Sequence, residues 1–194
     1  MSNIIITAFE PFNGRETNTS LEVLKQINLK NVLKKVLPVS WDKSREEVKK
    51  FFDLGPDLVV LCGEAGGRKN IALEEKAVNL MNASIPDNDG IYRNNQKIYD
   101  SVNSYFSNID VYDIAKKVNK DEEIVYVSSD AGTYICNTIY YHTLSIVYGN
   151  TYSTKVVFIH LPVSENEEDI KQKFPRTMEL IIEEIIKKYG IKSF

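Results

Sequence analysis

The chain has only two cysteines and two histidines, and one residue of each type lies where a thiol hydrolase would need it. Cys136 falls in the first turn of a helix predicted from Thr133 to Tyr148. Unpaired backbone N–H groups and the helix dipole favour a thiolate at such a position. A small apolar residue on a buried helix face is the plainer interpretation of Cys136, so its surroundings must decide between the two.

A thiol nucleophile needs an imidazole within hydrogen-bond reach. His160 ends an apolar run that predicts a buried strand, and ligands of open α/β sheets bind beyond the carboxyl ends of strands. We therefore expect His160 at the sheet edge that receives the start of the Cys136 helix. His142 lies six residues after Cys136, which is about 9 Å further along a helix and on another face, so we interpret it as a packing residue.

Cys62 ends a continuous apolar run and is interpreted as a core residue. A disulfide between Cys62 and Cys136 is not expected in a reducing compartment. The third member of a catalytic triad would be a carboxylate that fixes the imidazole tautomer. Position alone does not choose among the candidates, which are Glu10, Glu64, Glu74, Glu75, Asp87, Asp89 and Asp130.

Apolar runs rich in β-branched residues alternate with amphipathic stretches, which predicts an α/β fold in which strands of a mostly parallel sheet are connected through helices. Strands are expected at residues 3–9, 32–39, 58–62, 123–128 and 155–161, and helices at 20–29, 44–54, 110–119 and 133–148. A final helix is expected to begin at Ser164, to be interrupted near Pro175 and to end by Gly190. Ser44 and Glu47 have the spacing of a capping box, which predicts that Ser44 opens or lies within the helix that ends near Leu54. Residues 63–95 predict an excursion that carries a β-hairpin.

The composition limits the class of protein. With 194 residues, of which 43% are hydrophobic, we expect residues 1–194 to form one domain with its own core. The net charge of −3 without a long basic run disfavours nucleic-acid and anionic-membrane partners. Neither a membrane span nor a basic leader is present in the sequence, which predicts a cytoplasmic protein. No zinc-ligand spacing, dinucleotide fingerprint or P-loop occurs, so neither metal nor cofactor is expected.

Six motifs follow one another over nearly the whole chain. They are TAFEPFNG at 7–14 with NTS at 18–20, GEAGGR at 63–68, Glu74 with AVN at 77–79, IPDNDG at 85–90, AGTYICN at 131–137, and FIHLP at 158–162. Together they resemble the pyroglutamyl peptidase type I family, also called pyrrolidone-carboxylate peptidases, which are cytoplasmic cysteine peptidases. The set in this order and spacing is specific, whereas any one motif would be modest evidence.

The resemblance implies removal of N-terminal pyroglutamyl residues from peptides by a triad of Glu74, Cys136 and His160. It also implies a doubly wound α/β fold, with helices on both faces of the sheet, and a homo-oligomer, either a tetramer or a dimer. The lactam ring of the substrate would be held by residues that map here to Phe9, Phe12 and Tyr134, with Ile85 as an apolar wall. The region of Asn18 and the backbone near Glu64 would hydrogen-bond the lactam.

The chain departs from the family pattern near the expected site. Ser84 stands where an arginine is usual, Glu64 replaces glutamine, and Tyr134 replaces phenylalanine. Two alternatives therefore accompany the peptidase hypothesis. One is a catalytically weak homologue that binds lactams or blocked peptides, and the other is a cysteine hydrolase that acts on another small amide.

Overall fold

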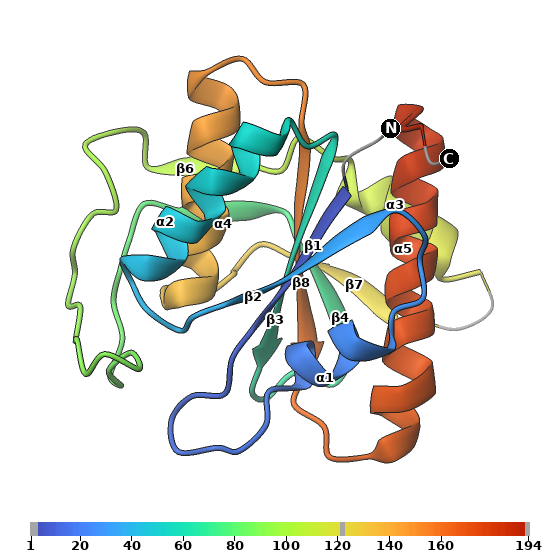
Figure 1. Cartoon of the computed structure of the whole chain (residues 1–194), viewed down its shortest axis with the longest axis horizontal. Helices are drawn as coiled ribbons and strands as arrows, with labels where there is room; N and C mark the ends of the chain where they lie inside the picture. Colours follow the sequence, from blue (N-terminus) through green and yellow to red (C-terminus); the bar gives the residue numbers. More distant parts are fainter. Residues whose placement is uncertain (1–3, 121–122, 193–194) are drawn as a thin grey trace.

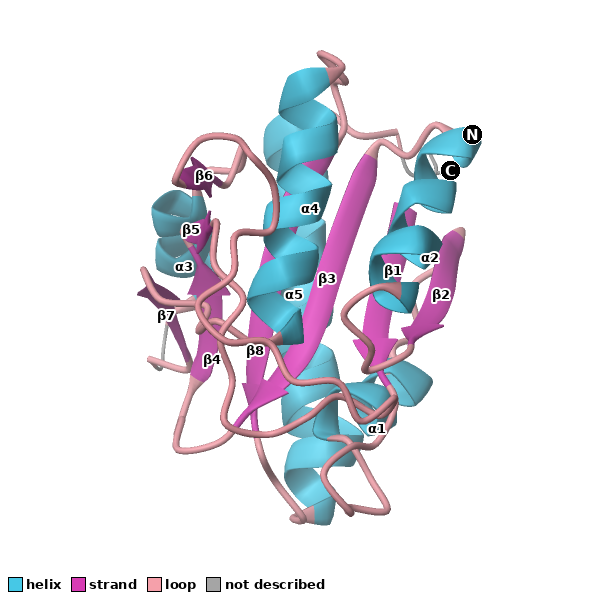
Figure 2. Ribbon diagram, turned by 90° about the vertical axis from the view of Figure 1, so that its left-hand side faces the viewer, coloured by secondary structure: helices cyan, strands magenta, loops and turns pink. Residues whose placement is uncertain are grey.

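A six-stranded sheet organises the computed structural model, which describes residues 4–120 and 123–192. Figure 2 shows the strands side by side in the order β2–β1–β3–β8–β4–β7, with β7 and β2 at the two edges. The strands are β1 Ile4–Phe9, β2 Val32–Leu37, β3 Leu58–Ala65, β4 Ile71–Glu74, β7 Val125–Ser128 and β8 Lys155–Pro162. The predicted strand at 3–9 includes Asn3, which lies outside the described residues.

Strand direction divides the sheet into two parts. Strands β2, β1, β3 and β8 pair in parallel, and β4 pairs in parallel with β7. Strand β4 runs antiparallel to β8, with Ala72 opposite His160 and Glu74 opposite Phe158. The prediction of a mostly parallel sheet is confirmed.

Helices cover both faces of the sheet, as predicted. Their bounds are α1 Thr19–Gln26, α2 Lys43–Phe51, α3 Val111–Val118, α4 Ile135–Gly149 and α5 Phe174–Tyr189, with a short 3-10 turn η1 at Phe52–Leu54. Figure 1 shows α2 and α4 on one side of the sheet and α1, α3 and α5 on the other. Alternate residues of β1 enter the two cores, Ile4 and Ile6 on the α5 side and Ile5 on the α4 side. All six residues of β1 are buried, which is typical of a parallel strand covered on both faces.

The predicted excursion at 63–95 is partly wrong. Residues 71–74 are all buried and form β4 inside the central sheet. The antiparallel pair lies further on, between β5 Lys76–Val78 and β6 Ser104–Phe106. A long connection, 79–103, joins these two strands and forms the outer left edge of Figure 1. A four-residue strand has too short a pattern to be separated from its neighbours by periodicity.

Ser44 lies inside α2, one of the two places predicted for it, and its hydroxyl donates a hydrogen bond to the carbonyl of Ser40. The start of the last helical segment differs from the prediction. The last helical segment starts after Asn166, whose Oδ1 accepts from the N–H of Glu168 at 2.8 Å. A π-helical turn, η2 Asp169–Lys173, then runs without a break into α5, because proline is tolerated in the first turn of a helix. Helix α5 ends before Gly190, as predicted, and this glycine has a left-handed conformation.

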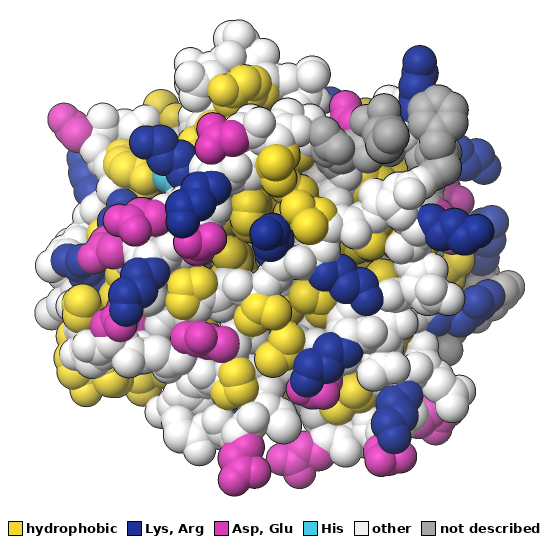
Figure 3. All heavy atoms as spheres, in the orientation of Figure 1, with side chains coloured by type: hydrophobic (Ala, Val, Ile, Leu, Met, Phe, Trp, Pro, Cys, Tyr) yellow, Lys and Arg dark blue, Asp and Glu magenta, His cyan; other side chains and the backbone are white. Residues whose placement is uncertain are grey.

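Charged side chains of both signs are intermixed on the face shown in Figure 3. Within the described ranges 4–120 and 123–192, none of the helices has the length and apolar character needed to cross a bilayer.

Candidate active site

The imidazole of His160 and the carboxylate of Glu74 form a buried pair. Nδ1 of His160 lies 2.7 Å from Oε1 of Glu74, and the two residues are 3% and 0% exposed. Because Ala72 lies opposite His160 on antiparallel strands, Glu74 projects from the same face two residues further along β4. The reversed direction of β4 thus brings the carboxylate beneath the histidine rather than to the edge of the sheet.

Cys136 approaches the same face from above. It is the second residue of α4, and its Sγ would be only 2.8 Å from a Cβ built on Gly63. Gly63 is the register partner of His160 on the neighbouring parallel strand, so the two residues share a face of the sheet. The absence of a side chain at Gly63 therefore leaves the space that the thiol occupies next to the histidine.

These residues open onto a cavity of about 130 Å³. Its lining residues are Phe9, Phe12, Asn18, Val39, Glu64, Ala131, Gly132, Tyr134, Ile135, Cys136 and His160. The cavity brings together seven of the nine residues singled out from the sequence. Glu74 lies behind His160, and Ile85 does not line the cavity although its neighbour Pro86 accepts a hydrogen bond from the Tyr134 hydroxyl at 2.8 Å.

Aromatic rings form one wall of this cavity. The ring centroids of Phe12 and Tyr134 are 5.9 Å apart, and the planes are tilted by 37°. Behind them, the fully buried Trp41 packs edge-on against Tyr134 at 5.1 Å. The only tryptophan of the chain was not identified from the sequence, although its place just after a strand was a possible signal.

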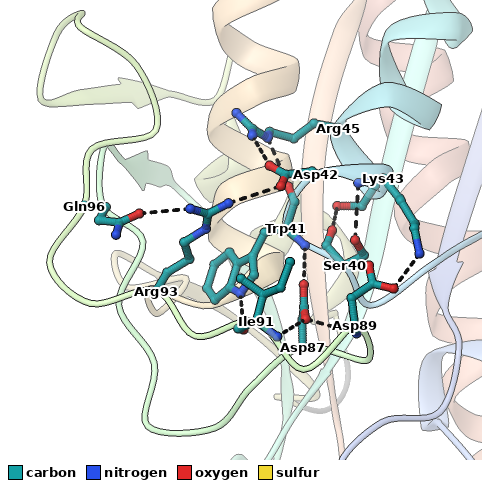
Figure 4. Close-up of polar contacts among 11 residues, drawn as sticks. Ser40, Trp41, Asp42, Lys43, Arg45, Asp87, Asp89, Ile91, Arg93 and Gln96 are labelled. Atoms are coloured by element: carbon teal, nitrogen blue, oxygen red, sulfur yellow. Dashed lines mark hydrogen bonds and ion pairs between the residues drawn. The ribbon is translucent and has the colours of Figure 1, made fainter.

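The loop that follows Ile85 and Pro86 is held against Trp41 by the hydrogen bonds of Asp87 and Ile91 (Figure 4). Oδ2 of Asp87 accepts from the backbone N–H of Trp41 at 3.0 Å, while Oδ1 accepts from those of Asp89 and Ile91 at 3.0 and 2.8 Å. The indole N–H of Trp41 donates in turn to the carbonyl of Ile91. The loop and the tryptophan therefore position each other.

The polar residues of the cavity are engaged with the protein itself. Glu64 pairs through Oε1 with Arg15 at 2.5 Å and through Oε2 with the backbone N–H of Thr19 at 2.7 Å. Asn18 caps α1, since its Oδ1 accepts a hydrogen bond from the backbone N–H of Ser20. Its Nδ2 donates to the carbonyl of Glu10. Arg15 compensates the negative charge that glutamate brings to the cavity.

The electrostatic environment disfavours a resting thiolate. Burial raises the pKa of the Cys136 thiol to about 12, and the carboxylates of Glu74 and Glu64 act in the same direction. Burial also lowers the pKa of His160, against the opposing effect of its hydrogen bond to Glu74. The expected stabilisation of thiolate by the helix start is outweighed, and the site combines a thiol with a neutral imidazole.

Comparison with known proteins identifies the family of the chain. Residues 2–188 match the family model described as pyroglutamyl peptidase. The chain belongs to this family. A pyrrolidone-carboxylate peptidase of Thermococcus onnurineus is 33% identical over 198 residues, which cover 98% of this chain and 99% of that relative. A second such peptidase, from Caldanaerobacter subterraneus, is 36% identical and covers 82% of this chain and 80% of its own.

Solved pyroglutamyl peptidase structures have the same fold. The pyrrolidone carboxyl peptidase of Thermococcus litoralis superposes with a TM-score of 0.88 at 27% identity, covering 100% of this chain and 99% of that one. The pyroglutamyl peptidase I of Bacillus amyloliquefaciens has a TM-score of 0.86 at 24% identity, covering 95% of this chain and 94% of its own, and shows the fold alone. The chain is thus an enzyme of the pyroglutamyl peptidase type among the cysteine peptidases.

The remaining thiol and imidazole of this pyroglutamyl peptidase homologue lie apart from the cavity. Cys62 packs into the core on the α5 side of the sheet, whereas Cys136 packs with the α4 side, and both thiols are free. His142 bonds to the Tyr99 hydroxyl at 2.6 Å and to the carbonyl of Arg45 at 3.0 Å. Both were interpreted as packing residues, and both are. Among residues 4–120 and 123–192, no three His, Cys, Asp or Glu side chains lie close enough to hold a metal ion.

Proposed function

We propose that this chain releases N-terminal pyroglutamate from peptides, with Cys136 as nucleophile, His160 as general base and acid, and Glu74 as the orienting carboxylate. The observation that carries the proposal is the 2.7 Å contact between Nδ1 of His160 and Oε1 of Glu74 beside a cavity that also holds Cys136. A proton held on Nδ1 by Glu74 leaves Nε2 of the neutral imidazole free to accept the proton of the thiol.

In the first half of the reaction, sulfur attacks the carbonyl carbon that follows the lactam ring while its proton passes to His160. The negative charge that develops on the carbonyl oxygen is stabilised by backbone N–H groups in the first turn of α4, which lack partners within the helix. His160 then returns the proton to the leaving amine, the C–N bond breaks, and a thioester to Cys136 forms.

In the second half, His160 removes a proton from water, and the oxygen attacks the thioester carbonyl. The C–S bond breaks, the proton returns to sulfur, and pyroglutamate leaves. The raised pKa of Cys136 and the lowered pKa of His160 support proton transfer in step with attack, because neither group is charged before substrate binds.

The cavity suits a flat, neutral ring. A pyroglutamyl group has no α-ammonium, so aromatic faces such as Phe12 and Tyr134 can stack on it without leaving a charge unpaired. The carboxylate of Glu64 is already paired with Arg15 and bonded to Thr19, so its charge is compensated within the protein and not by a peptide amine. We expect unblocked peptides to be excluded by the cost of burying their charged N-terminus.

Turnover of a fluorogenic pyroglutamyl amide by the wild type, Cys136→Ala and Cys62→Ala tests the proposal. Cys136→Ala should lose on the order of 10³-fold or more in kcat/KM. Cys62→Ala is the matched control, because it removes the other thiol from the opposite face of the sheet, and its turnover should match the wild type.

Equal turnover by Cys136→Ala and the wild type would refute the proposed nucleophile. Binding of pyroglutamate without hydrolysis would favour the lactam-binding alternative, and turnover of other acyl amides alone would favour the alternative hydrolase.

A homo-oligomer and a cytoplasmic location stay predictions of the family resemblance. Exposed apolar side chains at Val36, Phe106 and Tyr148 are candidate subunit contacts, which sedimentation velocity can test.

A further inference from the structure

Arg68 contacts the orienting carboxylate directly. It lies in the connection between β3 and β4, and its Nη2 is 2.8 Å from Oε1 of Glu74. The arginine side chain is 16% exposed and the glutamate side chain is fully buried, so the ion pair is largely shielded from water. Removing one partner of a buried ion pair leaves an uncompensated charge, which is strongly destabilising. The two side chains are therefore held in contact.

The oxygen that binds Arg68 is the same oxygen that binds the histidine. Oε1 of Glu74 accepts a hydrogen bond from Nδ1 of His160 at 2.7 Å and is ion-paired with Nη2 of Arg68 at 2.8 Å. The two partners approach from different elements, β8 and the β3–β4 connection. The position of this oxygen, and with it the hydrogen bond that orients the imidazole, therefore depends on both.

The guanidinium also reaches the segment that leads to the nucleophile. Nη2 donates to the carbonyl of Asp130 at 2.8 Å, and Nη1 donates to the hydroxyl of Tyr126 at 2.9 Å. Asp130 lies between β7 and α4, the helix that carries Cys136. A planar guanidinium can hold these partners at once, whereas a lysine ammonium cannot reproduce its forked geometry.

We propose that Arg68 is a positioning residue of the active site, which fixes Glu74 beneath His160 and ties this pair to the segment that precedes Cys136. This inference rests on the proposed function, because it assigns Arg68 a role in the same triad. Arg68 acts through Glu74 and makes no contact with substrate in this role.

The titratable and charged groups that face His160 allow the proposal to be tested by the pH dependence of activity. These groups are Glu74 on β4, Arg68 before β4, Asp130 before α4, Glu64 on β3 and the thiol of Cys136 on α4. Burial and the positive charge of Arg68 lower the pKa of His160, while Glu74 and Asp130 raise it. Removing Arg68 leaves Glu74 to pair with His160 alone, so protonation of the base should begin at higher pH.

The test compares Arg68→Met, Arg68→Lys and the control Lys69→Met, which removes an adjacent but exposed positive charge. Arg68→Met should lower kcat by about 10- to 100-fold with little change in KM, since the loss is one of alignment. In a plot of kcat/KM against pH, the acid limb of Arg68→Met should lie at higher pH than that of the wild type. Arg68→Lys should restore the acid limb but only part of kcat, and Lys69→Met should match the wild type.

The pH dependence of Cys136 alkylation by iodoacetamide gives a second readout that needs no turnover. Arg68 lowers the pKa of this thiol. Cys136 should therefore be alkylated more slowly in Arg68→Met than in Lys69→Met at each pH. Circular dichroism checks folding, and Arg68→Lys supplies the test if Arg68→Met does not fold. Unchanged kcat, acid limb and alkylation in the Arg68 variants would overturn the proposal. Absence of turnover by the wild type would refute the proposed function alone, because alkylation still reports on Arg68.

Discussion

At the scale of single residues, Gly63 matters through the space that it leaves for sulfur. A methyl group at this position would come within 2.8 Å of Sγ of Cys136 and 3.1 Å of the Phe158 ring. Gly63→Ala should displace the thiol from His160, and a shift of about 1 Å can lower kcat/KM by about 10²-fold. Steady-state kinetics with a pyroglutamyl amide, beside thermal unfolding, measures the effect.

Gly66→Ala is the matched control for this change. A Cβ at Gly66 would meet nothing within 4 Å, so both turnover and unfolding temperature should stay at the wild-type level. Wild-type kinetics in Gly63→Ala would show that the thiol position is not set by contact with β3.

Single residues differ in how far sequence could identify them. Cys136 and His160 were placed together by their positions at a helix start and a strand end. Glu74 was selected only through the family resemblance, because the rule that sites lie beyond carboxyl ends of strands assumes parallel strands. Strand β4 runs the other way and delivers Glu74 to the middle of β8. Arg68 and Trp41 act through tertiary contacts, so neither the motif that contains Arg68 nor the position of Trp41 after a strand specified these roles.

At the scale of elements, the loop beside the aromatic wall depends on the Asp87 carboxylate (Figure 4). Both of its oxygens accept backbone N–H groups, including that of Trp41. In Asp87→Asn, an NH2 group replaces one of the two carboxylate oxygens. A donor would then face a backbone N–H donor, and that hydrogen bond would be lost. We expect a loss of about 1–3 kcal/mol in the free energy of unfolding, and a KM that rises more than kcat falls.

Denaturant unfolding and steady-state kinetics check this prediction. Asp89→Asn is the control, since Asp89 is exposed and its carboxylate pairs with Lys43 at the surface. Such pairs contribute about 0–1 kcal/mol. Equal effects of the two substitutions would contradict the assigned role of Asp87.

Helices and strands with a clear apolar pattern were predicted from the sequence. A short strand that is recognisable only by its pairing with neighbouring strands was not. The runs that became β1, β3 and β8 are buried on both faces and stand out in the sequence. Strand β4 is only four residues long and is recognisable by its neighbours β7 and β8. The capping spacing at Ser44 left two places open, and the structure selects the one inside the helix, where a hydroxyl can bond the carbonyl four residues earlier.

At the scale of the whole molecule, His142 links stability to pH. Its Nε2 donates to the carbonyl of Arg45, so Nδ1 accepts from Tyr99 and the ring is neutral. Burial lowers its pKa from 6.5 to about 4. Below pH 6.5 the unfolded chain takes up a proton that the folded chain refuses, so stability falls as the pH drops towards 4.

Replacing this histidine should flatten that pH dependence. Between pH 7 and pH 5, His142 should account for about 2 kcal/mol of the decrease in the free energy of unfolding. Urea titrations of the wild type and His142→Gln at both pH values measure it, since glutamine retains a donor and an acceptor but does not titrate. Parallel decreases in the two proteins would exclude His142 as the source.

The placement of β8 has a consequence for how the enzyme is made. This strand comes last in the chain yet lies between β3 and β4 in the sheet. Until it inserts, the half with β1 to β3 and the half with β4 and β7 share no ladder, and the contact between Glu74 and His160 cannot form. Contacts so distant in sequence form slowly. During biosynthesis, the ribosome must therefore release β8 before any catalysis begins, and recovery of turnover should trail the return of helical signal after dilution from denaturant.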